Sequence, residues 1–307
     1  MKKRIASLLL AGTLTVTAFA GCGNAQETDT NTSSGENENV ATTEAQTSDD
    51  AAASEELTTI KIGVVGSVYD ELWAPAQEAL KDEGIDLEIV QFSDYNTPNN
   101  ALNSGEIDLN AFQHQIFLQS DVDANGYNVE TIGYTFIIPL NVYSNKVTSI
   151  EEIKDGDTIA IPNDVTNGGR AIKVLEAAGL ITLKDGASFS PTVDDIETYN
   201  VDITIEELQA NTIPSVLDDV TAAVVNGNYA LDFGLKTEEA IFKDTSVDEE
   251  EYWNIIVANS ADLEDAAKVE TYQKVVEAFQ SEATQTVFDE TFGGYFISVG
   301  WDQELLK

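Results

Sequence analysis

From Ile60 onward the chain alternates short apolar, β-branched runs with segments of helical periodicity. Such runs are typical of buried strands, and a strand–helix–strand–helix–strand order favours a parallel sheet with helices on both faces. We therefore expect an α/β fold. The first strands are expected at Ile60–Val65, Leu87–Phe92 and Ile107–Phe112, and the helices at Leu72–Glu83, after Thr97–Pro98, and up to about Ser120.

The remainder of the chain is expected to build a second unit. The run Tyr134–Tyr143 is long and is interrupted by Pro139, which suits a strand that crosses between two lobes. Within a folded domain at 58–307, we expect lobe I at about 58–143 plus about 230–307, and lobe II at about 144–229. The further strands are expected at Thr158–Ile161, Val201–Leu208, Thr221–Asn226 and Asn254–Asn259, with helices over about 262–279 and from Ser281.

The stretch Thr158–Leu180 joins a strand, a tight polar turn and a helix that Gly179 is placed to end. Arg170 falls in the first turn of that helix, beside backbone amides that have no partner within the helix. A guanidinium next to free amides and a helix dipole suits a small carboxylate. The alternative is that Thr166 or Asn167 only caps the helix and Arg170 pairs with a surface acid.

Ligands of open α/β sheets bind beyond the carboxyl ends of the strands. That rule selects four segments that together hold one arginine, several carboxamides, one histidine and aromatic rings, a set suited to a zwitterion with an apolar tail. His114 could equally be an ordinary core or surface histidine, and Asn226–Gly227 is also a strong hairpin signal. The four segments are Gly66–Tyr69, Phe112–His114, Asn163–Arg170 and Asn226–Asn228.

The composition excludes several classes of chemistry. The 307 residues include one cysteine, Cys22, and one histidine, His114, which excludes disulfides within the chain, cysteine-based zinc sites and cysteine–histidine catalysis. The formal net charge of -40 repels nucleic acid and anionic membranes. We expect no cofactor and no catalytic residue.

The first 22 residues have the pattern of a secretory signal, with a basic start and an apolar stretch too short for a membrane span. The stretch ends in Phe19-Ala20-Gly21-Cys22, which resembles a bacterial lipobox, so we expect Cys22 to be lipidated. An ordinary signal peptide with a chance cysteine is the alternative. Residues 23–57 are polar and acidic without any aromatic residue, which predicts a disordered tether.

Asp121–Gly126 reads DVDANG and matches the first half of a calcium loop. The closing glutamate is missing, because Ile132 occupies its position. A polar turn between a helix and a strand explains the same residues, and we predict no metal site.

Three motifs in order, NAFQH at Asn110–His114, IPNDVTNGGRA at Ile161–Ala171 and DDVTAAVVNGNYAL at Asp218–Leu231, resemble the NlpA family. These are the methionine-binding lipoproteins that feed ABC importers, and the resemblance runs from Ile60 to the C-terminus. It implies a two-lobed, periplasmic-binding-protein-like fold of type II, with the ligand cleft between the lobes.

The resemblance also implies roles for individual residues. Arg170 would hold the ligand carboxylate. The chain departs from the family after the first strand, where it reads GSVYDELWAPAQ, so we expect Tyr69 and Trp73 to reshape the pocket. Of the other residues, Asn163, Asn167, Asn226 and Asn228 would surround the polar end of the ligand, and Phe112, His114 and Tyr134 would flank its side chain.

The function that follows is an extracytoplasmic receptor, lipid-anchored to the cell membrane, that hands an amino acid, most simply L-methionine, to a membrane permease. A receptor of the same family for another small amino acid or a methionine-containing dipeptide is the first alternative. An acidic surface or adhesion protein and a secreted enzyme are more distant ones, since the sequence offers no nucleophile–base pair.

Overall fold

The computed structural model describes residues 57–306. The expected signal segment, Cys22 and all of the tether except Leu57 lie outside these residues. None of the helices within the described range combines the length and the apolar character that a membrane span requires.

The first sheet is parallel over its first three strands, as the sequence predicts, but it also contains antiparallel pairs. Its first three strands in the chain pair in parallel, whereas β12 runs antiparallel to both of its neighbours. The strand order is β2 (Ile85–Phe92), β1 (Thr58–Val65), β3 (Leu109–Asn110), β12 (Ile255–Asn259) and β4 (Val129–Tyr134).

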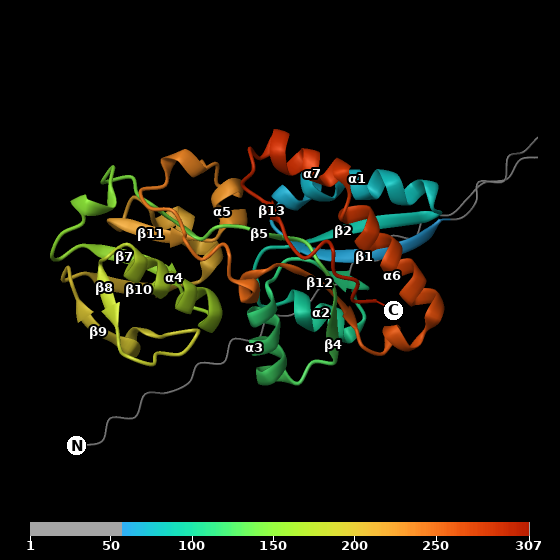
Figure 1. The fold of residues 1–307 in the computed structure, drawn as a ribbon, viewed down its shortest axis with the longest axis horizontal. Coiled ribbons are helices and arrows are strands. Elements are labelled where there is room, and N and C mark those ends of the chain that lie inside the picture. Colours follow the sequence, from blue (N-terminus) through green and yellow to red (C-terminus); the bar gives the residue numbers. More distant parts are fainter. Residues whose placement is uncertain (1–56, 307) are drawn as a thin grey trace, which may run out of the picture. The chain divides into compact units, whose positions relative to one another are not determined.

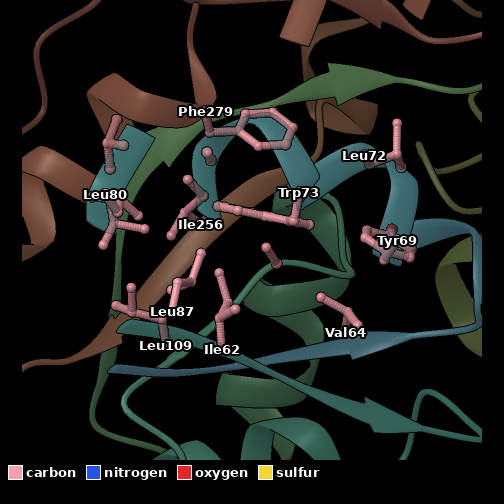
Figure 2. Close-up of a cluster of buried hydrophobic side chains, with 14 of the residues drawn as sticks. Ile62, Val64, Tyr69, Leu72, Trp73, Leu80, Leu87, Leu109, Ile256 and Phe279 are labelled. Atoms are coloured by element: carbon pink, nitrogen blue, oxygen red, sulfur yellow. The ribbon is translucent and has the colours of Figure 1, made fainter. Parts of the chain in front are cut away.

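Both faces of this sheet are covered, because the side chains of its strands alternate. Along β12, Ile256 packs in one apolar cluster, whereas Ile255 and Val257 pack in the opposite one. In the first cluster Trp73 lies against Phe279, with ring centroids 4.3 Å apart (Figure 2). That cluster includes residues of α1 (Val68–Asp82), α6 (Ala266–Phe279) and the π-helix η7 (Val287–Thr291), and α7 (Glu282–Thr286) contacts α1. The other cluster includes residues of α2 (Pro98–Ser104) and α3 (Gln115–Asn125).

The second sheet is smaller than the first (Figure 1). It also has an apolar cluster on each face. One face packs on α4 (Val165–Ala177) and the other on the 3-10 helix η3 (Ala210–Val216) and α5 (Gly227–Asp232). The strand order is β10 (Thr204–Leu208), β7 (Thr158–Pro162), β11 (Ala222–Val225) and β6 (Asn141–Tyr143), and β6 is antiparallel to β11.

Two segments connect the sheets. The first lies between Tyr134 at the end of β4 and Asn141 at the start of β6. The chain crosses around Pro139 as expected, but the run Tyr134–Tyr143 does not form one strand. The second follows Phe242, which bridges to Val142 in β6, and ends at β12. These pairings shift the expected boundaries, because Asn141–Tyr143 and Phe242 join the second sheet and not lobe I.

The remaining elements are short. Two pairs of strands form separate two-stranded sheets, β5 (Phe136–Ile137) with β13 (Ile297–Ser298) and β8 (Ile181–Leu183) with β9 (Ile196–Tyr199). The other 3-10 helices are η1 (Ile150–Glu152), η2 (Val193–Asp195), η4 (Thr237–Glu239), η5 (Glu250–Tyr252) and η6 (Asp262–Glu264).

Candidate functional site

The turn between β7 and α4 places two polar side chains in the interior. Asp164 caps α4 by accepting the backbone N–H of Asn167 at 2.8 Å. A side chain at Gly168 would lie 2.8 Å from the carbonyl oxygen of Pro162, and one at Gly169 would lie 2.7 Å from the backbone of Ser190. Only glycines therefore let the helix start close enough to its neighbours for Asn167 and Arg170 to be buried.

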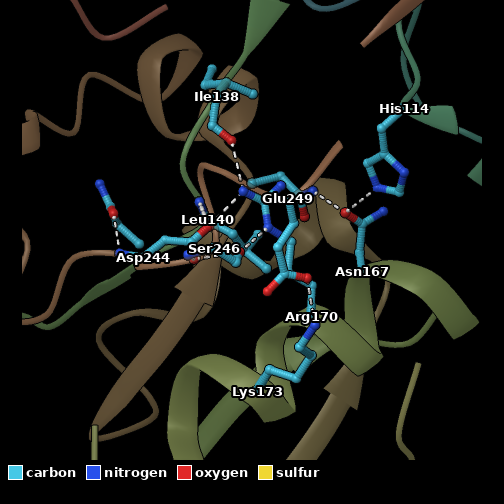
Figure 3. A network of polar contacts seen from close by, with 11 residues as sticks. His114, Ile138, Leu140, Asn167, Arg170, Lys173, Asp244, Ser246 and Glu249 are labelled. Carbon is cyan, nitrogen blue, oxygen red and sulfur yellow. Dashed lines mark hydrogen bonds and ion pairs between the residues drawn. The ribbon is translucent and has the colours of Figure 1, made fainter. Parts of the chain in front are cut away.

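The guanidinium of Arg170 is held on several sides. Its Nη2 lies 2.6 Å from Asp244 Oδ2 and donates to the Ile138 carbonyl at 3.2 Å, and its Nε donates to Ser246 Oγ at 3.1 Å (Figure 3). The ring of Tyr252 lies 4.4 Å from the guanidinium carbon. Within residues 57–306, Nη1 has no hydrogen-bond partner, so this nitrogen remains available to a ligand.

The side chain of Asn226, close to Arg170, provides a hydrogen-bond acceptor without a partner among the described residues. Asn167 donates its Nδ2 to Asp164, so its Oδ1 must accept, and Asn226 donates Nδ2 to it at 2.8 Å. The Oδ1 of Asn226 is then a buried acceptor without a partner among the described residues. Asn226 reaches this position at the start of α5, where Gly227 packs directly on the side chain of Ile138.

His114 is neutral in this site. Its Nδ1 accepts the backbone N–H of Phe117 at 3.2 Å and caps α3, so the proton lies on Nε2, which is 3.4 Å from Asn167 Oδ1. Burial, with a smaller contribution from the charge of Arg170, lowers the pKa of His114 to about 3. The histidine therefore adds no charge beside the arginine at neutral pH.

Aromatic rings form an apolar wall of the site. The ring of Tyr95 lies 6.0 Å from those of Phe112 and Phe117 and 4.9 Å from that of Tyr229. Its hydroxyl donates to Asn228 Oδ1, and Asn228 donates in turn to the carbonyl of Val65 at 2.9 Å. This link fixes the orientation of the amide and of the ring.

These groups line one cavity. Like other ligand sites for small molecules, it combines an apolar lining with a few polar groups. The predicted residues that line it are Tyr69, Phe112, His114, Asn167, Arg170, Asn226 and Asn228, and the lining also includes Tyr95, Phe117, Gln113, Asn254, Leu140 and the segment Ile138–Pro139.

Three residues singled out from the sequence lie elsewhere. Asn163 is exposed and lines an adjoining hollow with Asp164. The ring of Tyr134 lies outside the cavity, 5.6 Å from that of Trp253. Trp73 is fully buried in the core of the first sheet. The expectation that Trp73 reshapes the pocket is therefore wrong.

Several residues of the site escaped the sequence analysis. Tyr95 follows the carboxyl end of β2, so the strand-end rule could have found it. Phe117 lies one helical turn beyond the NAFQH motif. Asp244, Ser246 and Tyr252 belong to the second connecting segment and carry no local signal.

The calcium-like motif is part of a helix. Asp121 and Asn125 lie in the last turns of α3, where Asn125 Nδ2 donates to the Asp121 carboxylate at 2.7 Å, and Gly126 ends the helix. A helical backbone does not present the ligands of a calcium loop. Within the described residues, no group of three or more histidine, cysteine, aspartate or glutamate side chains could hold a metal ion.

Comparison with known proteins identifies the family. The D-methionine-binding lipoprotein MetQ of Escherichia coli (strain K12) is 39% identical over 246 residues, which cover 79% of this chain and 88% of that protein. A nutrient-binding protein of Burkholderia cenocepacia, solved bound to methionine, is 36% identical with a TM-score of 0.73, over 78% of this chain and 100% of that one. A periplasmic substrate-binding protein of an ABC transporter from Coxiella burnetii is 33% identical with a TM-score of 0.72, over 78% and 100% of the two chains.

These structures confirm the expected two-lobed α/β fold of periplasmic substrate-binding proteins. The sequence profile of the NlpA lipoproteins matches residues 60–300, which is most of the chain. The resemblance seen in the three motifs therefore extends over residues 60–300, and the chain belongs to the NlpA lipoprotein family.

Proposed function

We propose that this protein is a lipid-anchored receptor outside the cytoplasm that binds methionine in the cavity around Arg170 and delivers it to an ABC importer. Its family consists of substrate-binding proteins and not of enzymes. The relative from Escherichia coli is named for methionine binding, and the one from Burkholderia cenocepacia was solved with methionine.

One observation carries the proposal. Within the described residues the cavity offers one guanidinium nitrogen without a partner, Arg170 Nη1, and one buried amide oxygen without a partner, Asn226 Oδ1. A free donor with positive charge suits an α-carboxylate, and a free acceptor suits an α-ammonium group. The pair therefore matches the polar end of an amino acid.

The aromatic wall selects the side chain. A thioether is unbranched and polarizable, and it makes favourable contacts with aromatic rings. The rings of Phe112, Phe117 and Tyr95 line the cavity together with the imidazole of His114. Burial of the methionine side chain contributes roughly 2–3 kcal/mol over alanine, so alanine should bind some tens to a hundred times more weakly.

Calorimetric titration of the purified, ligand-free protein tests the proposal. We expect one molecule of L-methionine to bind per protein, norleucine to follow closely, and alanine to bind far more weakly. D-Methionine belongs in the series because the Escherichia coli relative is named for it. Glutamine or Gly-Met binding about tenfold tighter than either methionine would replace the ligand with another amino acid or with a dipeptide.

Membership of a lipoprotein family supports a location at the outer face of the cell membrane. We propose that Cys22 carries the lipid and that residues 23–57 tether the binding domain to the cell membrane. That attachment would let the domain meet the permease while it remains at the membrane.

A further inference from the structure

Asp244 accepts four hydrogen bonds although its side chain is only 1% exposed. Its Oδ2 accepts from Arg170 Nη2 at 2.6 Å and from the Leu140 N–H at 3.0 Å. Its Oδ1 accepts from the N–H of Ser246 at 2.8 Å and from the Ser246 hydroxyl at 2.7 Å. All four partners are donors, so the group that fits this position is an ionised carboxylate.

Arg170 lines the cavity and Asp244 does not. The Asp244 carboxylate contacts the guanidinium of Arg170 (Figure 3). Arg170 is the charged residue in that lining, and His114 beside it is neutral. Of the other acids near the site, Asp164 and Asp232 each accept backbone N–H groups at the start of a helix, where the helix dipole favours a negative charge. Glu249 pairs with Lys173 at 2.7 Å. The charge that faces a ligand is therefore set by the Arg170–Asp244 pair.

We propose that Asp244 is a specificity-determining residue: by cancelling the charge of Arg170, it makes the cavity select molecules without net charge. A zwitterionic amino acid brings its own ammonium group, so the complex holds two balanced pairs of charges. The 2-hydroxy acid of the same length brings only a carboxylate and would leave one negative charge uncompensated in a buried site. This inference rests on the proposed function and adds the charge class of its ligands.

Two variants separate charge from geometry. Asp244→Asn removes the charge, and Ser246→Ala disturbs the same network without any change in charge. Calorimetry at pH 7 compares L-methionine with its 2-hydroxy acid analogue for each protein, and thermal unfolding reports whether each variant is folded.

The measured quantity is the ratio of the affinity for methionine to the affinity for its 2-hydroxy acid analogue. We expect the wild-type protein to prefer methionine by at least about tenfold, and Asp244→Asn to reduce that preference by at least about tenfold, because Arg170 then faces the ligand with an uncompensated charge. Ser246→Ala should weaken both ligands and leave their ratio unchanged. A purely structural role of Asp244 predicts an unchanged ratio in both variants, and that result would overturn the inference.

The wild-type protein also tests the inference if Asp244→Asn does not fold. Binding of the hydroxy acid as tightly as methionine by the wild type would overturn the inference and leave methionine binding intact. If the folded wild type bound no methionine, the proposed function itself would fail.

Discussion

Replacement of Arg170 by alanine should affect both stability and binding, and the structure predicts each effect separately. Arg170 and Asp244 form an ion pair whose side chains are 4% and 1% exposed. The substitution leaves the carboxylate of Asp244 buried without its cation, which typically costs about 3–5 kcal/mol. In a domain of about 250 residues this loss lowers the Tm by roughly 6–20 °C.

Binding should fall at the same time. Loss of the cation that faces the ligand carboxylate should raise the Kd for methionine by about two to three and a half decades. At a methionine concentration 100 times the wild-type Kd, the ligand stabilises the wild-type protein by about 2.7 kcal/mol. A variant with a hundredfold higher Kd gains only about 0.4 kcal/mol at that concentration.

Thermal unfolding with and without methionine measures both effects. The wild-type Tm should rise by roughly 5–11 °C on addition of methionine, and that of Arg170→Ala by about 1–2 °C. The double variant Arg170→Met/Asp244→Asn should recover part of the lost stability, because no charge remains buried alone, but it should not recover binding.

A control on the same helix distinguishes the site from a general loss of positive charge. Lys173 pairs with Glu249 at 2.7 Å, but both side chains are partly exposed. Lys173→Ala should therefore change the stability by less than about 1 kcal/mol and leave the methionine-induced shift in place. If Arg170→Ala bound methionine within about threefold of the wild type, Arg170 would not hold the ligand carboxylate.

Three further predictions concern other parts of the chain. Cys22→Ser should move the protein from the membrane fraction to the soluble fraction after cell fractionation, and a protein still wholly in the membrane fraction would contradict lipidation at Cys22. Because the pKa of His114 falls on folding from 6.5 to about 3, its contribution to stability is complete above about pH 6.5 and declines as the pH falls toward 3, so stability between these values should depend less on pH in His114→Gln, as chemical denaturation can show. Gly168→Ala should lower both stability and methionine affinity, because its methyl group would push α4 away from the carbonyl of Pro162, and an unchanged Tm would show that the close approach is not required.

Much of the fold could be predicted because local patterns and tertiary packing agree. The strand at Thr158–Pro162 and the helix that carries Arg170 have clear apolar periodicity and a turn between them. The start of α1 could not be predicted, because its cap is the carboxylate of Asp232, which accepts from Ser67 and Val68 across 164 residues or more. Long-range capping of this kind leaves no sequence pattern beside the helix.

In the site, too, local patterns predict some residues, whereas others are positioned by long-range contacts. Residues at the carboxyl ends of strands, such as His114 and Asn226, could be placed together from the topology alone. Asp244 could not, because it lies 74 residues from Arg170 and outside any helix or strand. Tyr134 was chosen through family resemblance, and the structure packs its ring on Trp253 instead of in the cavity.

Mass spectrometry of the small molecules released when the purified protein is denatured can identify the ligand that the protein binds in cells. A cavity with a free guanidinium nitrogen, a free amide oxygen and an aromatic wall should retain its ligand through purification from cells. We predict that methionine is released in near one-to-one ratio from the wild type and is absent from Arg170→Ala. Release of a different amino acid or a peptide, or of methionine in equal amount from both proteins, would contradict this account.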